Sequence, residues 1–304
     1  MLAYLALATA MILTGINVAL GKIIVTEMPP ASFAMLRFVL ASACLVPLAM
    51  TEKGARASLL ALTKRQWFEI FLLSLFGVVG FTTLMLIGIQ YTSAINAGII
   101  ASSLPAIIAL LSWLVLREYV SPRKALSVAL AVVGIACINL ATPETSAGSS
   151  HVWSQTLLGN GLILAAVTSE AIFAILTRRY ANMIPPWTLT MIVHLLAIPI
   201  TLPVLMRQDG GWVIPQANAS FWLLAVYYII TASVVSFYLW CVGIKSVSAS
   251  SSALFTALVP TSTLLVAVFA LGEKLIMLQI VGLIAVLASL FIGLKASATS
   301  HSTT

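Results

Sequence analysis

The stretch Gly88-Ile89-Gln90-Tyr91-Thr92-Ser93-Ala94 has a related copy in this chain, Gly243-Ile244-Lys245-Ser246-Val247-Ser248-Ala249, with four of the seven positions identical. The offset is 155 residues, and at this offset the segments 88–118 and 243–273 share 8 of 31 positions without a gap. The shared positions include a proline near the middle of each segment and a glutamate at its end. Similarity at a fixed offset indicates that the chain was built by duplication.

A second match extends the duplication toward the N-terminus. Met28-Pro29-Pro30 is echoed by Ile184-Pro185-Pro186 at an offset of 156 residues. The sequence therefore predicts two related halves, residues 1–145 and 146–296. The segment 297–304 is polar, and we expect it to be a disordered tail.

The composition identifies the solvent of the folded chain. Hydrophobic residues make up 61% of 304 residues, charged residues make up 8%, and the mean hydropathy is +1.12. Soluble domains carry about 25% charged residues, so this composition predicts an integral membrane protein. The net charge of +7 fits basic cytoplasmic loops, and we expect membrane lipid and no nucleic acid as a partner. The first apolar run has no preceding Lys or Arg, and we expect it to remain as a helix.

The apolar runs predict an all-α protein with ten transmembrane helices. A membrane-spanning helix needs about 20 mostly apolar residues. Ten segments meet this requirement: 2–24, 32–50, 67–90, 94–116, 124–141, 156–177, 187–206, 220–242, 250–271 and 277–295.

The basic residues predict the orientation of these spans. With a cytoplasmic N-terminus, inner segments hold 11 of the 15 Lys and Arg residues, outer loops hold Arg207 and Lys274, and Lys22 and Arg37 fall within spans. This asymmetry follows the positive-inside rule and predicts that both termini are cytoplasmic. Five spans in each half is an odd number, so the halves would lie inverted in the membrane, as in many transporters.

Two prolines occupy matched positions near the middle of predicted spans. Pro105 lies in the fourth span and its copy Pro260 in the ninth. A proline inside a helix removes a hydrogen bond, and matched helix breaks at the membrane midplane often serve as hinges or substrate contacts in transporters. The alternative is that both prolines merely kink their helices.

Order, spacing and repeat together resemble the drug/metabolite transporter superfamily, and in particular its EamA-type permeases. The first half contains Thr14-Gly15-Ile16-Asn17, then Met28-Pro29-Pro30 and Arg37-Phe38-Val39-Leu40-Ala41, in the order typical of that family. The first helix of the second half ends in Arg178-Arg179, also as in the family. The resemblance covers about residues 2–295. Many relatives carry Trp where this chain has Thr14.

The resemblance implies a secondary transporter of the cell inner membrane that works by alternating access. Its substrate would be a small molecule, most often an amino acid, neutral or aromatic, moved in the export direction. One chain holding both inverted halves could act as a monomer. Export of other small metabolites or of cationic drugs, coupled to protons through Glu170, is the alternative, and a non-transporting membrane subunit is a more remote one.

Glu170 is the most informative single residue in the spans. It lies about two-thirds of the way through the sixth span toward the cytoplasm. A charge within the membrane costs about 2.5–3.5 kcal/mol on insertion scales, so Glu170 should face a cavity or a partner. We expect it to bind a substrate ammonium group or to carry a coupling proton. The structural alternative is a hydrogen-bonded carboxyl, paired with Arg178 or Arg179.

Other polar residues of the spans are candidates for the cavity wall. Asn17 offers an amide at the centre of the first span, and either substrate recognition or helix–helix hydrogen bonding would explain it. Arg37 is a candidate for internal ion pairing. Tyr228 is the aromatic residue of the eighth span nearest the midplane. The remaining candidates are small and polar, and they could equally serve close helix packing: Thr14, Ser102, Ser103, Ser169 and Thr256.

The sequence carries no catalytic or metal-binding pattern. Walker-type glycine loops, His-Glu-x-x-His and Gly-x-Ser-x-Gly are absent, and the only Asp is Asp209, in a predicted loop. Cys44, Cys137 and Cys241 show no metal-ligand spacing. We therefore expect no enzymatic activity, no cofactor and no metal.

Overall fold

The computed structural model describes residues 2–104, 106–108, 110–111, 122–140, 150–208, 210–246, 255–256 and 258–300. Within these residues the chain forms helices and no strand. The helices of the first half are α1 (Leu2–Glu27), α2 (Pro30–Met50), α3 (Ala55–Leu60), α4 (Lys64–Leu73), η1 (Ser74–Gly80), α5 (Phe81–Tyr91), α6 (Ala94–Ala101) and α8 (Pro122–Leu140). Those of the second half are α9 (Ser150–Tyr180), α10 (Pro186–Arg207), α11 (Ala219–Ile229), η3 (Ile230–Val235), α12 (Ser236–Ser246), α14 (Leu258–Phe269) and α15 (Met277–Ser300).

Six helices are long and apolar enough to cross a membrane: Leu2–Glu27, Pro30–Met50, Lys64–Tyr91, Trp153–Thr177, Pro186–Arg207 and Ala219–Ser246. They coincide, to within a few residues at most ends, with six of the ten predicted spans. Shorter apolar helices lie in three others, at Ala125–Cys137, Leu258–Phe269 and Met277–Ser289. The structure thus shows a helical membrane protein, while the count of ten spans stays a prediction.

The predicted span at 94–116 is interrupted. Helix α6 ends at Ala101, and Ser102 and Ser103 form a turn. In the second half, Pro260 lies in the first turn of α14, where a proline costs no helical hydrogen bond. Its copy Pro105 lies outside the described residues. Each predicted hinge region therefore contains or adjoins a helix end among the residues that are described.

Residues at the same position of the two halves are called repeat mates below. The offset between mates is 156 in the first two helices of each half and 155 from the third helix onward. The third helix of each half contains a π-helical segment at the same place, because residues 75–80 of η1 are the mates of η3. Such segments are rare and often lie at functional sites. The repeat therefore extends to an irregularity of the backbone.

The mates α2 and α10 pack against each other and run antiparallel. The Glu52 carboxylate, just after α2, accepts hydrogen bonds from the backbone N–H groups of Trp187 and Thr188 at the start of α10, at 3.0 and 2.8 Å. Gln208 is the mate of Glu52, and its Oε1 accepts from the N–H of Ala31 at the start of α2, at 3.2 Å. The N-terminus of each helix is thus capped by a side chain that lies just after the C-terminus of the other helix.

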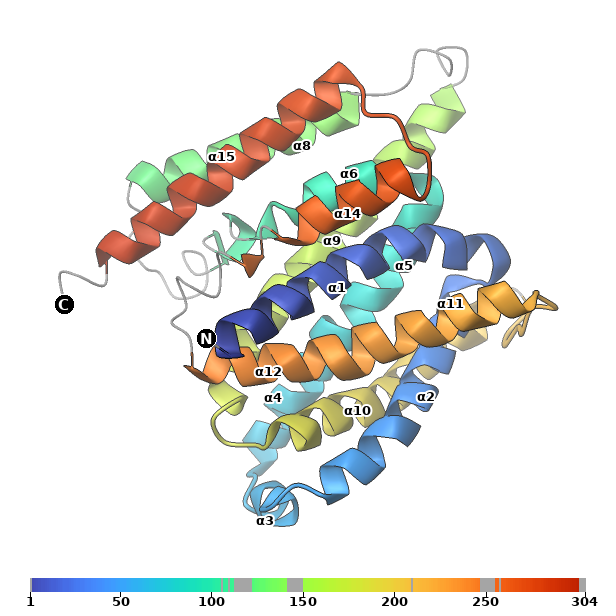
Figure 1. Cartoon of the computed structure of the whole chain (residues 1–304), viewed down its shortest axis with the longest axis vertical. Coiled ribbons are helices and arrows are strands. Elements are labelled where there is room, and N and C mark those ends of the chain that lie inside the picture. The colour runs from blue at the N-terminus through green and yellow to red at the C-terminus, as the bar shows by residue number, and fades with distance from the viewer. Residues whose placement is uncertain are drawn as a thin grey trace.

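The mates α8 and α15 form a second antiparallel pair, which lies at the top of the molecule in Figure 1, above α6 and α14. The Ser127 hydroxyl donates to the Ser289 carbonyl at 2.8 Å. Gly134 lies seven residues after Ser127 in α8, and a Cβ added to it would lie 2.8 Å from the Gly282 carbonyl oxygen. Ser127 and Gly282 are mates, as are Gly134 and Ser289, so the two contacts are the same contact made twice.

The close packing of α5 against α9 is repeated in the packing of α12 against α1. A Cβ on Gly88 in α5 would lie 2.7 Å from Ile163 in α9, and one on Gly243 in α12 would lie 2.5 Å from Leu7 in α1. Gly88 and Gly243 are mates, and so are Leu7 and Ile163. Small residues at these positions let the helix backbones approach closely.

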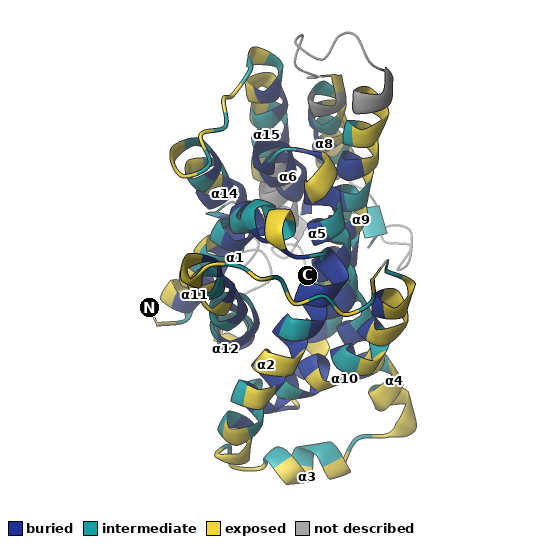
Figure 2. Cartoon of the chain, turned by 90° about the vertical axis from the view of Figure 1, so that its right-hand side faces the viewer, coloured by how far each residue is buried: buried dark blue, intermediate teal, exposed yellow. Residues whose placement is uncertain are grey.

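Two segments differ from the sequence-based expectation. Helix α3 is a short exposed helix in the predicted loop between the second and third spans, at the bottom of Figure 2. Helix α15 continues through Ser300, so residues 297–300 of the predicted disordered tail are helical. Residues 301–304 lie outside the described part of the chain.

Candidate functional site

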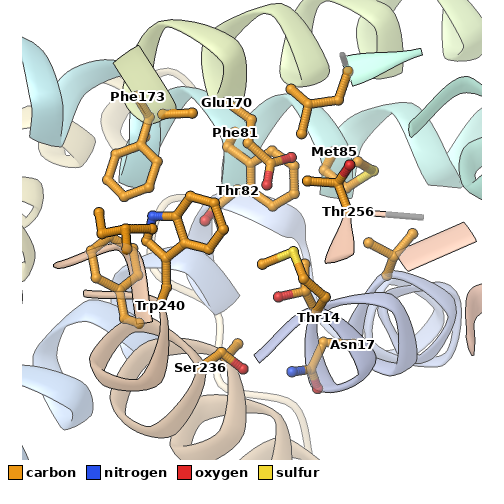
Figure 3. Close-up of a pocket in the computed structure, with 18 of the residues that line it drawn as sticks. Thr14, Asn17, Phe81, Thr82, Met85, Glu170, Phe173, Ser236, Trp240 and Thr256 are labelled. Atoms are coloured by element: carbon orange, nitrogen blue, oxygen red, sulfur yellow. The ribbon is translucent and has the colours of Figure 1, made fainter. Parts of the chain in front are cut away.

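A cavity of about 490 Å³ lies between the two halves. Its wall is mostly apolar and is built from α1, α2, η1, α5, α9, α11, η3 and α12 and from residues beside α6 and α14. Polar groups on the wall come from Thr14, Asn17, Arg37, Thr82, Glu170, Tyr228, Ser236 and Thr256. Apolar groups include Met11, Phe81, Met85, Phe173, Phe237 and Trp240. Figure 3 shows most of these side chains converging on one space from several helices.

Glu170 points from α9 into this space (Figure 3). No described residue forms a hydrogen bond or an ion pair with its carboxyl group. Arg179, one of the two partners expected for it, instead pairs with Glu69 at 2.9 Å. The side chain of Arg178, the other, lies outside the description. Glu170 is therefore an acidic group whose described surroundings leave it available to a molecule in the cavity.

Arg37 is the basic group of the cavity wall and is only 5% exposed. Its Nε donates to the Ser233 hydroxyl at 2.6 Å and its Nη1 donates to the Thr82 hydroxyl at 3.0 Å. The guanidinium carbon also lies 5.6 Å from the centre of the Tyr228 ring, within cation–π range. Within the described residues no carboxylate pairs with Arg37, so its partners are neutral and its charge is not compensated there.

Asn17 and Thr14 line the cavity from α1. The Asn17 Nδ2 donates to the Thr231 hydroxyl at 3.0 Å, and that hydroxyl lies 3.1 Å from Asn17 Oδ1. This bond connects α1 to η3, as the helix–helix interpretation predicts. The Thr14 hydroxyl donates to the Ala10 carbonyl at 2.8 Å within its own helix. Both side chains therefore shape the wall while their polar atoms are already bonded.

Tyr228 and Thr256 also reach the cavity wall. Tyr228 is buried, and its ring meets Phe33 edge-on at a centroid distance of 5.2 Å. That contact and the proximity to Arg37 hold the ring beside the guanidinium. Thr256 lines the opposite region, next to α14.

Three predicted wall residues lie elsewhere. Ser102 and Ser103 donate to backbone carbonyls of their own helix, at 2.8 Å to Ile99 and 2.6 Å to Ile100. Ser169 is buried beside Gly80 and is not part of the wall. Pro260 is likewise buried away from the cavity. The structure therefore brings together Thr14, Asn17, Arg37, Glu170, Tyr228 and Thr256, and leaves the three serines out.

The sequence interpretation missed much of the wall, including Phe81, Thr82, Met85, Ser236 and Trp240. The repeat carries the signal that would have found them. Phe81 and Ser236 are mates, Met85 and Trp240 are mates, and every one of these residues lines the cavity. At these positions, alignment of the halves combined with one known wall residue would have predicted its mate.

The described residues contain no cluster of three or more His, Cys, Asp or Glu side chains that could hold a metal ion. Cys44, Cys137 and Cys241 are free and lie on different helices. The arrangement therefore suits reversible binding of a small molecule carrying both polar and apolar groups.

Known proteins resemble this chain along nearly its whole length. A profile of the EamA-like transporter family matches residues 1–140 and 157–294. The chain is 32% identical to Uncharacterized transporter YetK of Bacillus subtilis (strain 168) over 291 residues, which cover 95% of this chain and 86% of the relative. It is 24% identical to Uncharacterized transporter YyaM of the same organism, over 93% of this chain and 90% of the relative. One crystal structure of a protein superposes with a TM-score of 0.63 at 20% identity, over 95% of both chains, which shows a common fold.

Proposed function

The chain belongs to the EamA-like transporter family, and we propose that it exports neutral or aromatic amino acids by alternating access. The family and the curated relatives are transporters, and the apolar helices make the chain a multi-pass membrane protein. Substrate, direction and mechanism are the parts that the proposal adds.

One observation carries the choice of substrate. Among the described residues, the wall of this largely apolar cavity contains one carboxyl group, Glu170, and one guanidinium, Arg37. An amino acid is a zwitterion, so its ammonium group could pair with Glu170 and its carboxylate with Arg37. The aromatic and aliphatic groups of Phe81, Met85 and Phe173 would surround an apolar side chain.

The antiparallel contacts between mates support an inverted arrangement of two five-helix halves. A pair such as α2 and α10 could exchange roles between inward-open and outward-open states because each half makes the contacts of the other. The basic residues favour a location in the cell inner membrane with both termini in the cytoplasm. Crosslinks that lock either face of the cavity should then stop transport.

The test is uptake by purified protein in liposomes, with labelled neutral, aromatic and cationic amino acids. Wild type is compared with Glu170→Gln, which keeps the size of the side chain and removes its charge. Glu27→Gln, at the exposed end of α1, is the matched control. Saturable flux that is lost in Glu170→Gln and kept in Glu27→Gln would support the proposal. Absence of flux for all amino acids would overturn it.

The free carboxyl of Glu170 also favours a second candidate, proton-coupled export of other small metabolites or cationic compounds. A carboxyl with no described partner can bind either a proton or a cation, so that one replaces the other in the same cavity. Imposing a proton gradient across the liposomes separates the candidates. Flux of a cationic compound that needs the gradient, without flux of amino acids, would select this second reading.

A further inference from the structure

Two buried hydrogen-bond donors on the cavity wall have no partner. The Ser236 hydroxyl and the indole Nε1 of Trp240 have almost no exposed surface and form no hydrogen bond. Both residues belong to α12, four positions apart, so they lie on one face of that helix. Both line the cavity, and Figure 3 shows the Trp240 ring extending from α12 into it.

Buried polar atoms without a hydrogen-bond partner are uncommon in folded proteins, so each one needs an explanation. In the described part of the chain, five side-chain atoms are in this condition. The other three belong to Ser42, Thr83 and His194, which are not part of the cavity wall. Two unpaired donors on one helix of the cavity wall are explained if a ligand supplies the acceptors.

The surroundings of the two donors indicate the charge of that acceptor. Ser233, which binds Arg37 Nε, precedes Ser236 by three residues on the same continuous helix. The hydrogen bonds of Arg37 to Ser233 and Thr82 use two of its five N–H donors and leave the rest of the guanidinium for other partners. Ser236 and Trp240 reach the cavity from α12 and Glu170 reaches it from α9 (Figure 3), and Arg37 lines the same cavity from α2.

We propose that Ser236 and Trp240, together with Arg37, form a subsite for a carboxylate of the transported molecule. Two neutral donors and a cation suit an anionic group with several lone pairs better than a neutral carbonyl. Because the two donor atoms have almost no exposed surface, binding requires side-chain rotations that bring them to the cavity. This subsite rests on the proposed amino-acid substrate and specifies which wall holds its carboxylate.

The test uses three probes that differ only in their charged groups. L-phenylalanine carries an ammonium and a carboxylate, 3-phenylpropionate carries only the carboxylate, and phenethylamine carries only the ammonium. Their affinities for the full-length protein in detergent are measured by calorimetric titration. The variants are Ser236→Ala, which removes its donor with little change of shape, and Trp240→Phe, which removes the indole N–H together with part of the ring.

Matched controls come from the same chain. Ser42→Ala removes another unpaired buried hydroxyl, and Trp222→Phe removes another indole N–H, both outside the cavity wall. We expect Ser236→Ala and Trp240→Phe to weaken binding of phenylalanine and of 3-phenylpropionate by about 10-fold, the usual order for a hydrogen bond to a charged group. Phenethylamine should bind the variants as it binds wild type, and the controls should bind all three probes normally.

The outcomes separate this subsite from the amino-acid proposal. Equal weakening of all three probes would indicate a change of shape and overturn the subsite, as would unchanged binding of the two carboxylates. If 3-phenylpropionate binds in a Ser236- and Trp240-dependent manner while phenylalanine does not bind, the subsite stands and the amino-acid proposal falls. If wild type binds none of the probes, both are wrong.

Discussion

The two halves of the molecule place several of the same backbone positions around the cavity but give them different side chains. In the first half the wall carries Thr14, Asn17 and Thr82, and their mates in the second half are Glu170, Phe173 and Phe237. The scaffold around them is nearly the same, down to a π-helical segment in each third helix. At these three positions small polar groups line the first half, and a carboxyl and two aromatic rings line the second.

The difference shows which features serve folding and which serve binding. Contacts that hold helices together are made twice, as with the reciprocal caps of α2 and α10. The charged groups that the described residues place on the cavity wall are not repeated, because the mate of Arg37 is Val193 and the mate of Glu170 is Thr14. Alternating access requires similar halves, whereas recognition of an asymmetric ligand requires different side chains in the two halves. The positions at which the side chains of mates differ are therefore the ones to test.

The largest effect is expected when Arg37 is made like its mate. Arg37→Val removes the guanidinium that the described residues contribute to the cavity wall and leaves the hydroxyls of Ser233 and Thr82 without its bonds. Loss of two charge-assisted hydrogen bonds and of the cation should reduce transport of a zwitterion by roughly 100-fold or more. Uptake by proteoliposomes measures it.

Arg207→Gln is the matched control for Arg37→Val, because Arg207 is an exposed arginine outside the cavity. Size-exclusion profiles should show both variants folded. Retention of wild-type transport by a folded Arg37→Val protein would show that the guanidinium does not act on the substrate.

The next effect concerns the position of the acidic group. Glu170→Thr makes α9 like α1 and should weaken amino-acid binding by about 10-fold to 100-fold, as expected for a lost charged contact. The double variant Thr14→Glu/Glu170→Thr moves the carboxyl to its mate, which lines the same cavity. Partial recovery of binding is expected, because the scaffold is shared.

Titration of binding in wild type, in each single variant and in the double variant forms a complete cycle. Additive losses in the double variant would mean that the two mate positions do not face the same ligand group. That result would limit the symmetry to the backbone.

These unequal positions also show what the sequence could predict. The spans follow from hydropathy, and Glu170 and Asn17 were found because polar groups are rare in membrane segments. Phe81 and Trp240 were missed because an aromatic residue in an apolar span gives no signal of the side it faces. The serines at 102 and 103 were over-interpreted because a hydroxyl can bond its own helix backbone. The π-helical segments have no sequence signature in this chain.

A smaller effect on folding is expected where one half packs more tightly than the other. Gly77 in η1 lies against Phe173, and an added Cβ would lie 2.0 Å from the Phe173 ring. Its mate, Ala232, already carries a Cβ. Gly77→Ala should therefore destabilise the fold by about 1–3 kcal/mol through overpacking, whereas Ala232→Gly should cost about 1 kcal/mol or less. Thermal unfolding in detergent measures both, and equal shifts for the two variants would contradict the difference in packing.

The smallest effects concern the reciprocal caps, where mates have similar positions and different hydrogen bonds. Glu52 only accepts, from two backbone N–H groups and from the Thr188 hydroxyl at 2.8 Å. Gln208 accepts from Ala31 but also donates through Nε2, to the Ser32 hydroxyl at 2.9 Å and to the Gly211 carbonyl at 2.8 Å. A carboxylate cannot donate, and an amide can accept through only one of its two ends.

Exchanging these caps should therefore cost stability at both ends. Glu52→Gln places an N–H₂ group against donors of α10, and Gln208→Glu leaves the Ser32 and Gly211 contacts without a donor. Each change should lower the free energy of unfolding by about 1 kcal/mol, the usual size of a helix cap. The double exchange should give the sum of the two losses, because the caps lie at opposite ends of the helix pair and share no partner. Denaturant titration of the four proteins in detergent measures these terms, and recovery in the double variant would show that the caps are interchangeable and that the halves are more alike than their side chains indicate.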